Sequence, residues 1–343
     1  MARPKQKVSI ISLAKEFGVS APTISKALSN SKEVSESLRG RVRARADELG
    51  FTPKRPRRTT HNICVVLDLE INGSFRLESF QAAVVSGVYD FCSERKIEFS
   101  ILGENFEKLE AMDLTKELCR RNADAAVIIR AKAERKYLEN LQSNRFPFVC
   151  VYDGPPENTI TLNDHLVGEL ALNHLVELGH TRIAIARNVG RRASSGRFMG
   201  FVQAAAIRGL AADAVTEVIP SKLGTGYEVG HEILREWIAQ NRPWSAIFCT
   251  SDNVATGILS EAVQRGIQIP SELSVLTCDD IVSNAEAAPP LSVVDIPNQQ
   301  AGYLAAQHAW EILTSDSSSI ELPAPLTVEH VIARASTAPL LQA

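Results

Sequence analysis

The chain has 343 residues, of which 45% are hydrophobic and 22% charged, and its formal net charge is -3. This length exceeds what one hydrophobic core usually serves, so we expect two or three domains of ordinary globular composition. The N-terminus has no apolar signal core, and no apolar stretch is long enough to span a membrane. These features argue against membrane and exported proteins, and we expect a cytoplasmic location.

The charge is divided unevenly along the chain. Residues 1–61 hold 14 Lys and Arg against 5 Asp and Glu, a net charge of +9, whereas the remainder carries -12. A small basic segment on a large acidic body indicates that only the N-terminal segment meets a polyanion such as DNA. The alternative is a solvated basic tail.

Three short helices are predicted near the N-terminus. Ser9 can cap the first helix, and Gly18 supplies the turn after it. Ser20 can cap a second helix over residues 21–28, and an arginine-rich third helix follows. Two helices joined by a tight turn and followed by a third predict a helix-turn-helix DNA-binding domain over residues 1–51.

The second of these helices carries the predicted DNA contacts. In a helix-turn-helix domain it lies in the major groove with its N-terminal part toward the base edges. Thr23 and Ser25 are suited to phosphate oxygens, and Lys26 to a guanine edge or a phosphate. The alternative is that the two hydroxyls only cap the helix or face water. We predict contacts to DNA from Ser20, Ala21, Pro22, Thr23, Ser25, Lys26 and Ser29.

A basic linker, residues 52–62, joins this head to the rest of the chain. Its sequence "TPKRPRRTTHN" is rich in arginine and broken by proline, which favours an extended strip over a helix. Such a strip is typical of an arm that enters a minor groove, and we predict that Arg55, Arg57 and Arg58 contact DNA. In the free protein the same segment can be a flexible solvated linker.

The body, residues 63–343, alternates short apolar runs with amphipathic helices. "ICVVLDL", "EFSILGE", "ADAAVIIRA" and "FPFVCVYD" are the first predicted strands, separated by helices that include ranges near 107–121 and 133–144. The pattern then repeats. This alternation predicts an α/β fold with two parallel sheets covered on both faces, one in each of two lobes. We expect the chain to cross between the lobes near residues 160–166 and 292–298.

Acidic and hydroxyl side chains follow several of these predicted strands. Ligands of open α/β sheets sit beyond the carboxyl ends of strands, so a cleft between the lobes is the predicted ligand site. An acid in this position can equally be a helix cap or a solvated loop residue. Carboxylates that converge on one cleft suit a polyhydroxylated ligand such as a sugar. The candidates are Asp68, Asp153, Ser251, Asp252, Asp279 and Asp280.

The segment "VSIISLAKEFGVSAPTISKALSNSKEVSESLRGRVRARADELGFTP" resembles the head of the lactose/galactose repressor (LacI/GalR) family of bacterial transcription regulators. The resemblance implies that Ala21, Pro22 and Lys26 select the operator. Ala21 and Pro22 offer only apolar contacts, so hydrogen-bond readout falls mainly on Lys26.

The resemblance continues through the body to "ARASTA" near the C-terminus. "RFMGF" is similar to a family motif whose arginine, here Arg197, contacts the effector. "TSDNVATGIL" places Ser251 and Asp252 in the cleft, and "LSVLTCDDIVSNAEAAPPLSVVDIP" places Asp279 there. Asp153 matches another acid of the cleft. The family's fold would make this body a two-lobed, periplasmic-binding-protein-like effector and dimerisation domain.

The chain also departs from the family pattern. Relatives have a longer linker that forms a hinge helix with a Leu wedge, whereas this linker is shorter, lacks that Leu and contains Pro56. Cys278 replaces a usual aromatic residue, and "PSKLG" at 220–224 lacks the aromatic that often stacks on the ligand. The loop "DLEINGSFRLES" adds Arg76 and Glu78.

An enzymatic function has little support in the sequence. There is no Walker loop, no GxSxG and no metal-ligand spacing, and "GTGYEVG" has Val229 where a dinucleotide fingerprint needs its third glycine. Six cysteines lie far apart, without a CxxC pair or Cys/His cluster, so we expect no disulfide, metal or other cofactor.

We therefore predict a transcription regulator, a repressor that binds a near-palindromic operator as a homodimer and responds to a small-molecule effector. A sugar-binding protein without a DNA role is the alternative. A general DNA-coating protein would leave the large body unexplained.

Overall fold

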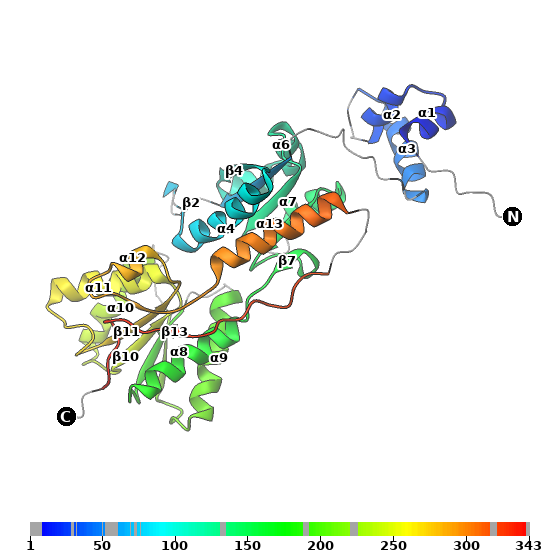
Figure 1. Ribbon diagram of the computed structural model, residues 1–343. Coiled ribbons are helices and arrows are strands. Elements are labelled where there is room, and N and C mark those ends of the chain that lie inside the picture. The colour runs from blue at the N-terminus through cyan, green and yellow to red at the C-terminus, as the bar shows by residue number, and fades with distance from the viewer. Residues whose placement is uncertain are drawn as a thin grey trace. The chain divides into compact units, whose positions relative to one another are not determined.

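The computed structural model describes residues 9–28, 31, 33–49, 51, 61–68, 70–71, 74–75, 77–130, 135–187, 192–219, 226–315 and 321–340 (Figure 1). Ser29, Arg55, Arg57 and Arg58, four of the predicted DNA contacts, lie outside these residues. The chain divides into two compact units, Met1–Thr59 and Thr60–Ala343, here called the head and the body.

The head holds three helices, α1 (Ile10–Phe17), α2 (Ala21–Leu28) and α3 (Glu36–Glu48). Ser9 caps α1 by accepting from the backbone N–H of Ser12 at 3.1 Å, and Gly18 ends α1 in the left-handed conformation with φ of 64°. The three helices close around one small apolar core, formed by Leu13, Ala14, Ile24, Ala27, Val34, Val42 and Ala46. The predicted helix-turn-helix is confirmed.

The first lobe of the body is a five-stranded parallel sheet in the order β4-β1-β5-β6-β7. Its strands are β1 (Asn62–Asp68), β4 (Glu98–Glu104), β5 (Ala125–Ile129), β6 (Phe148–Val151) and β7 (Thr159–Ile160). Helices α4 (Ser79–Arg95) and α13 (Asn298–Thr314) pack on one face of the sheet. The other face is covered by α5 (Phe106–Ala111), α6 (Leu114–Arg120) and α7 (Lys136–Ser143).

The side chains of β1 show why its sequence is a continuous apolar run. Ile63, Val65 and Leu67 pack in the core with α4 and α13, whereas Cys64 and Val66 pack in the core with α6 and α7. Because successive side chains of a strand point to opposite faces, a sheet covered on both sides needs apolar residues at every position.

The second lobe is built in the same way, from a six-stranded sheet in the order β13-β12-β11-β10-β8-β9. Its strands are β8 (Ile183–Ala186), β9 (Val215–Val218), β10 (Ala246–Cys249), β11 (Ser274–Cys278), β12 (Ser292–Val294) and the antiparallel edge strand β13 (Val331–Ile332). Helices α8 (Asp164–Glu177) and α9 (Arg192–Ile207) belong to one core. Helices α10 (Gly226–Ala239) and α11 (Asp252–Arg265) belong to the other, and α12 (Val282–Ala285) is a single turn.

Outside the two main sheets, β2 (Glu70–Ile71) pairs antiparallel with β3 (Ser74–Phe75). The short 3-10 helix η1 (Pro156–Asn158) precedes β7.

Three segments of the chain join the lobes. The first runs from β7 to α8, and the second from β12 to α13. A third returns after α13 and pairs with the first through a bridge between Leu162 and Leu326, where the N–H of Asn163 donates to the Leu326 carbonyl at 2.8 Å. The sequence did not predict this third crossing.

One predicted helix is divided in the structure. The range near 107–121 forms α5 and α6, because Asp113 caps a new helix by accepting from the N–H of Lys116 at 3.1 Å. The helix expected near 133–144 begins at Lys136, and residues 131–134 lie outside the described part of the chain.

Glycines set the spacing of three helix pairs in the body. A Cβ added to Gly257 on α11 would lie 2.1 Å from the Tyr227 carbonyl oxygen of α10, and one added to Gly230 would lie 2.2 Å from the Val254 carbonyl oxygen. Gly87 and Gly302 make the same close approach between α4 and α13, and Gly168 and Gly200 make it between α8 and α9. These backbones touch, so any side chain would force the helices apart.

We expect Gly257→Ala to lower the free energy of unfolding of the body by about 1–3 kcal/mol through this overpacking. Gly40 on α3 has no atom within 4 Å of an added Cβ, so Gly40→Ala should stabilise the head by about 0.5–1 kcal/mol. Hydrogen exchange followed by mass spectrometry reports each unit separately. A body as stable in Gly257→Ala as in the wild type would contradict the close packing.

Candidate DNA-binding and effector-binding sites

Helix α2, the second helix of the helix-turn-helix, presents one face to the head's core and another to solvent. Ile24 and Ala27 are buried, while Pro22, Ser25 and Lys26 are exposed. Ser20 is exposed, and its hydroxyl accepts from the backbone N–H of Thr23 at 3.3 Å and lies 2.8 Å from the Thr23 hydroxyl. Ser20 and Thr23 are therefore engaged in capping α2.

Lys26 forms an ion pair with Glu33, and the two side chains are 50% and 69% exposed. Ion pairs at such exposure contribute little to stability, so a DNA phosphate or base can replace Glu33 as the partner of Lys26. Two arginines of α3 make contacts within the head. Arg41 lies over the ring of Phe17 at 5.6 Å, and Arg45 donates to Glu16 at 2.7 Å.

In the body, the candidate effector residues follow the carboxyl ends of strands. Asp153 comes two residues after β6, Ser251 and Asp252 lead from β10 into α11, and Asp279 comes directly after β11. All three strands lie in parallel parts of their sheets. The residues of each lobe therefore gather at the carboxyl ends of the strands of that lobe.

Arg197 on α9 binds three other elements of the second lobe. Its Nε donates to Asp164 Oδ1 of α8 at 3.0 Å, and one terminal nitrogen donates to the Thr250 carbonyl at 3.0 Å. The same nitrogen lies 3.5 Å from Cys278 Sγ. Burial raises the pKa of the Cys278 thiol to about 12, so this contact is to a neutral group. With a side chain only 12% exposed, Arg197 is a fixed donor at the strand ends.

Asp279 accepts from the amide of Asn298, whose Nδ2 lies 2.6 Å from Asp279 Oδ1. The phenol of Tyr152 donates in turn to Asn298 Oδ1 at 2.7 Å. Burial raises the pKa of Asp279 to about 6, and Arg197 offsets part of that rise. Asp279 therefore changes charge close to neutral pH.

Asp252 is the second acid held at this edge. Burial raises its pKa, and hydrogen bonds from the backbone N–H of Asn253 and the hydroxyl of Ser79 offset part of that rise. Ser79 is the first residue of α4, so a group of the first lobe lowers the pKa of this acid of the second lobe.

Three residues at strand ends adopt the left-handed backbone conformation although they are not glycine. They are Arg130 after β5, Tyr152 after β6 and Asp279 after β11, with φ of 64°, 69° and 70°. Each costs on the order of 1–2 kcal/mol, and such strain concentrates at functional sites. Arg130 also forms an ion pair with Glu78 and lies 5.0 Å over the Phe80 ring.

The other candidates are placed less decisively. Asp153 and Ser251 are half-buried, and Asp280 pairs with Arg334 at 2.5 Å on the surface. The side chain of Asp68 lies outside the described part of the chain. Sequence reasoning missed Ser79, Tyr152, Asp164, Thr250 and Asn298, because hydrogen bonds between distant segments leave no local pattern.

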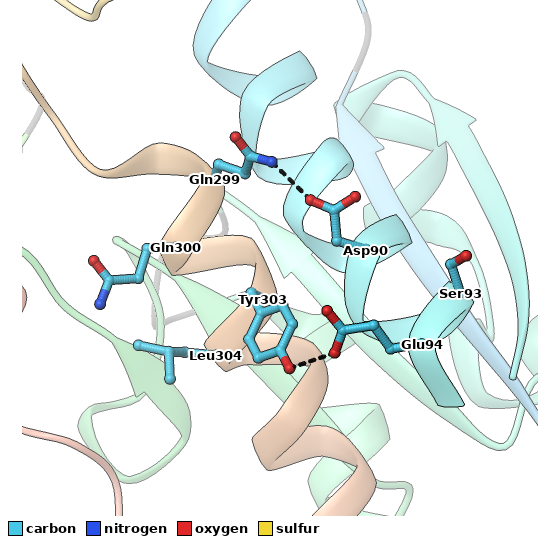
Figure 2. A pocket seen from close by; sticks show the side chains of 7 residues that line it. All are labelled: Asp90, Ser93, Glu94, Gln299, Gln300, Tyr303 and Leu304. Atoms are coloured by element: carbon cyan, nitrogen blue, oxygen red, sulfur yellow. Dashed lines mark hydrogen bonds between the residues drawn. The ribbon is translucent and has the colours of Figure 1, made fainter. Parts of the chain in front are cut away.

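A separate groove of about 640 Å³ lies along α4 and α13 (Figure 2). Gln299 donates to Asp90 at 2.7 Å and Tyr303 donates to Glu94 at 2.8 Å. Figure 2 shows both hydrogen bonds as dashed lines. No predicted effector residue lines it. These bonds fasten α13 to α4, and we assign the groove no ligand.

Within the described ranges, no helix is long and apolar enough to cross a membrane. Nor does any group of three or more His, Cys, Asp or Glu side chains there have the arrangement of a metal site.

Residues 9–54 match the sequence profile of the bacterial regulatory proteins of the lacI family, and residues 172–337 match that of a periplasmic binding protein-like domain. The chain joins a lacI-family DNA-binding domain to a periplasmic binding protein-like domain. It is a DNA-binding transcription regulator and not an enzyme, as the sequence predicted.

Similar proteins of this family extend over nearly the same length. The transcriptional repressor PurR of Haemophilus influenzae is 23% identical over 325 residues, which cover 91% of this chain and 93% of that protein. The ribose operon repressor of Escherichia coli is 25% identical, covering 85% and 89%. A solved complex of the regulator CelR with cellobiose has a TM-score of 0.67 at 25% identity, covering 97% of this chain and all of that one.

We expect Arg197→Ala to destabilise the body by about 3 kcal/mol, because it leaves Asp164 without its partner in a nearly buried position. Arg208→Ala is the control: its bridge to Glu177 is 40% and 65% exposed and should contribute less than about 1 kcal/mol. Urea unfolding of both variants measures the difference. An equal loss in the free energy of unfolding of the two variants would contradict a larger contribution from the Arg197 contacts.

Proposed function

We propose that the chain is a cytoplasmic repressor that binds a near-palindromic operator as a homodimer and changes its operator affinity when a sugar-like effector occupies the body. One observation carries the proposal: buried Asp279 and half-buried Arg197 and Asp252 gather at the strand ends of a body joined to a helix-turn-helix head. The two bindings are thermodynamically linked when the effector binds the DNA-binding and the non-binding state of the chain with different affinities.

At the operator, α2 supplies the base contacts and Lys26 the direct hydrogen-bond readout. Pro22 and Ala21 offer apolar surface to a thymine methyl, and Ser25 reaches phosphate. The linker arginines Arg57 and Arg58 follow the minor groove beside each half-site. A single head covers too little DNA for tight specific binding, so two copies act together.

The edge of the first lobe offers a surface for the second copy. Strand β4 ends the sheet order, so one of its sides has no neighbouring strand among the described residues. Ile101 on β4 is 42% exposed and Tyr89 on α4 is 55% exposed, and the Tyr89 ring packs edge-on against Phe99 at 6.1 Å. An apolar sheet edge of this kind is suited to a symmetric contact with itself.

The effector site favours a ligand with several hydroxyl groups. Asp252 and Asp279 accept hydrogen bonds, and the guanidinium of Arg197 donates them, so vicinal hydroxyls can satisfy both kinds of group. CelR, which is similar in structure, was solved with cellobiose, and the similar E. coli protein is named for the ribose operon. Both relatives support a saccharide as the first class to test.

The operator prediction is tested by selecting DNA from a random pool and footprinting the bound sequence. We expect half-sites about one helical turn apart and two chains per site by sedimentation. Lys26→Ala should relax the preference at one base pair in each half-site, a loss of about 1–3 kcal/mol. Lys108→Ala, on α5 of the body, is the control. Tight binding of one chain to an isolated half-site would contradict the proposal.

The linker arginines should behave differently from Lys26. Replacing Arg57 and Arg58 by Ala should reduce the preference for an A·T-rich operator centre and flatten the slope of log K against log salt by up to about two. If the double variant keeps the slope and the preference at the operator centre, the linker only connects the head to the body and does not contact DNA.

The effector prediction is tested by thermal shift with a panel of monosaccharides, disaccharides and sugar acids. A binding sugar should raise the Tm with its concentration, and it should change operator affinity in gel shifts. Asp252→Asn keeps the shape of the side chain but removes the acceptor charge. At least tenfold more ligand should therefore be needed to reach the same rise in Tm. Asp213→Asn, at an exposed site, is the control. A sugar that shifts the Tm without affecting operator binding would favour the alternative, a sugar-binding protein.

A further inference from the structure

Half-buried Tyr152 and buried Asn298 and Asp279 come from distant segments and form one hydrogen-bonded row between the lobes. Tyr152 follows β6 of the first lobe, and Asn298 begins α13, which packs on α4 in the same lobe. Asp279 follows β11 of the second lobe. The O–H of Tyr152 donates to Asn298 Oδ1 at 2.7 Å, and Asn298 Nδ2 donates to Asp279 Oδ1 at 2.6 Å.

We infer that Tyr152 and Asn298 are positioning residues: they orient the Asp279 carboxylate in the effector site and tie it to the first lobe. The inference rests on the proposed function only in naming Asp279 an effector contact. It assigns roles to two residues that no motif of the sequence marks, and it makes the effector-binding acid part of the contact between the lobes.

The order of donors and acceptors fixes the geometry. A phenol that stays protonated must donate to an amide oxygen here, and burial raises the pKa of Tyr152 above its usual value. With its oxygen turned to Tyr152, the amide of Asn298 presents its N–H groups to Asp279. Asn298 is 4% exposed and Asp279 is 8% exposed, so water cannot easily replace either bond. One oxygen of Asp279 is thereby held, and the other is the acceptor we assign to the effector.

The charged groups around Asp279 come from every element that packs on it. Arg197 of α9 and the Asn298 amide of α13 stabilise the carboxylate. Asp252 at the start of α11 and Asp295 after β12 oppose it, and the Cys278 thiol is neutral. Removing the Asn298 amide therefore removes one of the two groups that keep Asp279 ionised.

The experiment follows the ionisation of Asp279 in the full chain, without any effector. The carboxyl resonance of Asp279, assigned with Asp279→Asn, is titrated by carbon-13 NMR in the wild type, Tyr152→Phe and Asn298→Leu. We expect Asn298→Leu to raise the titration midpoint by about one pH unit or more, the shift that a lost charge-assisted hydrogen bond produces. Tyr152→Phe, which removes one oxygen and keeps the ring, should raise it by less because the amide loses its fixed orientation.

The pH dependence of unfolding gives a second readout. The folded protein holds a proton on Asp279 at pH values where the unfolded chain has lost it, so this group's contribution to stability falls as pH rises from about 4 to the folded pKa of about 6, and is level above it. In Asn298→Leu the decline should extend to higher pH. In Asp279→Asn it should vanish, whichever residue stands at 298.

Tyr303→Phe is the control, because it also removes a phenol that donates to a side-chain oxygen, here that of Glu94, but in the groove along α4 and α13. A midpoint raised in Tyr152→Phe and unchanged in Tyr303→Phe supports the positioning role. A midpoint equal in the wild type and Tyr152→Phe overturns it, even if Asn298→Leu fails to fold. Since no effector is used, this result stands apart from the operator and sugar assays that decide the proposed function.

Discussion

The Arg197 guanidinium holds together the side chains of the proposed effector site. It joins α8, α9 and the ends of β10 and β11 through hydrogen bonds that it can make only when all four elements are in place. A planar group with five N–H donors can serve as a structural fastener and still offer donors to a ligand. These bonds to protein groups fix the orientation of the guanidinium, which limits the ordering that ligand binding requires.

The fold could be predicted from the sequence because its determinants are local. The run "ICVVL" is apolar at every position, which identified a strand covered on both faces, and the structure places alternate side chains of β1 in two different cores. Ser9 and Gly18 marked the ends of α1 for equally local reasons. The helix divided at Asp113 shows the limit of this reasoning, because an acid that caps a helix looks the same in sequence as one inside it.

The contacts within the proposed effector site could be predicted only in part. Acids after apolar strands indicated Asp252 and Asp279, since the ends of parallel strands gather at one edge of a sheet. The partners of those acids could not be found in the same way. Asn298 lies 19 residues from Asp279 in the chain and 146 from Tyr152, and an asparagine or a tyrosine at such a distance has no periodicity to distinguish it. Asp280 looked equivalent to Asp279 in sequence, but only the structure shows that it turns to Arg334 on the surface.

The third crossing between the lobes has a mechanical consequence. Two separate connecting segments would allow the two lobes to twist relative to each other as well as to bend. The added segment around Leu326 is bonded to the first crossing near Leu162, which makes a small ribbon instead of separate threads. Two paired segments bend together easily but resist twisting about their long axis. We therefore expect the lobes to move relative to each other mainly in one opening and closing direction. A ligand that favours one end of that direction therefore acts on a single structural coordinate.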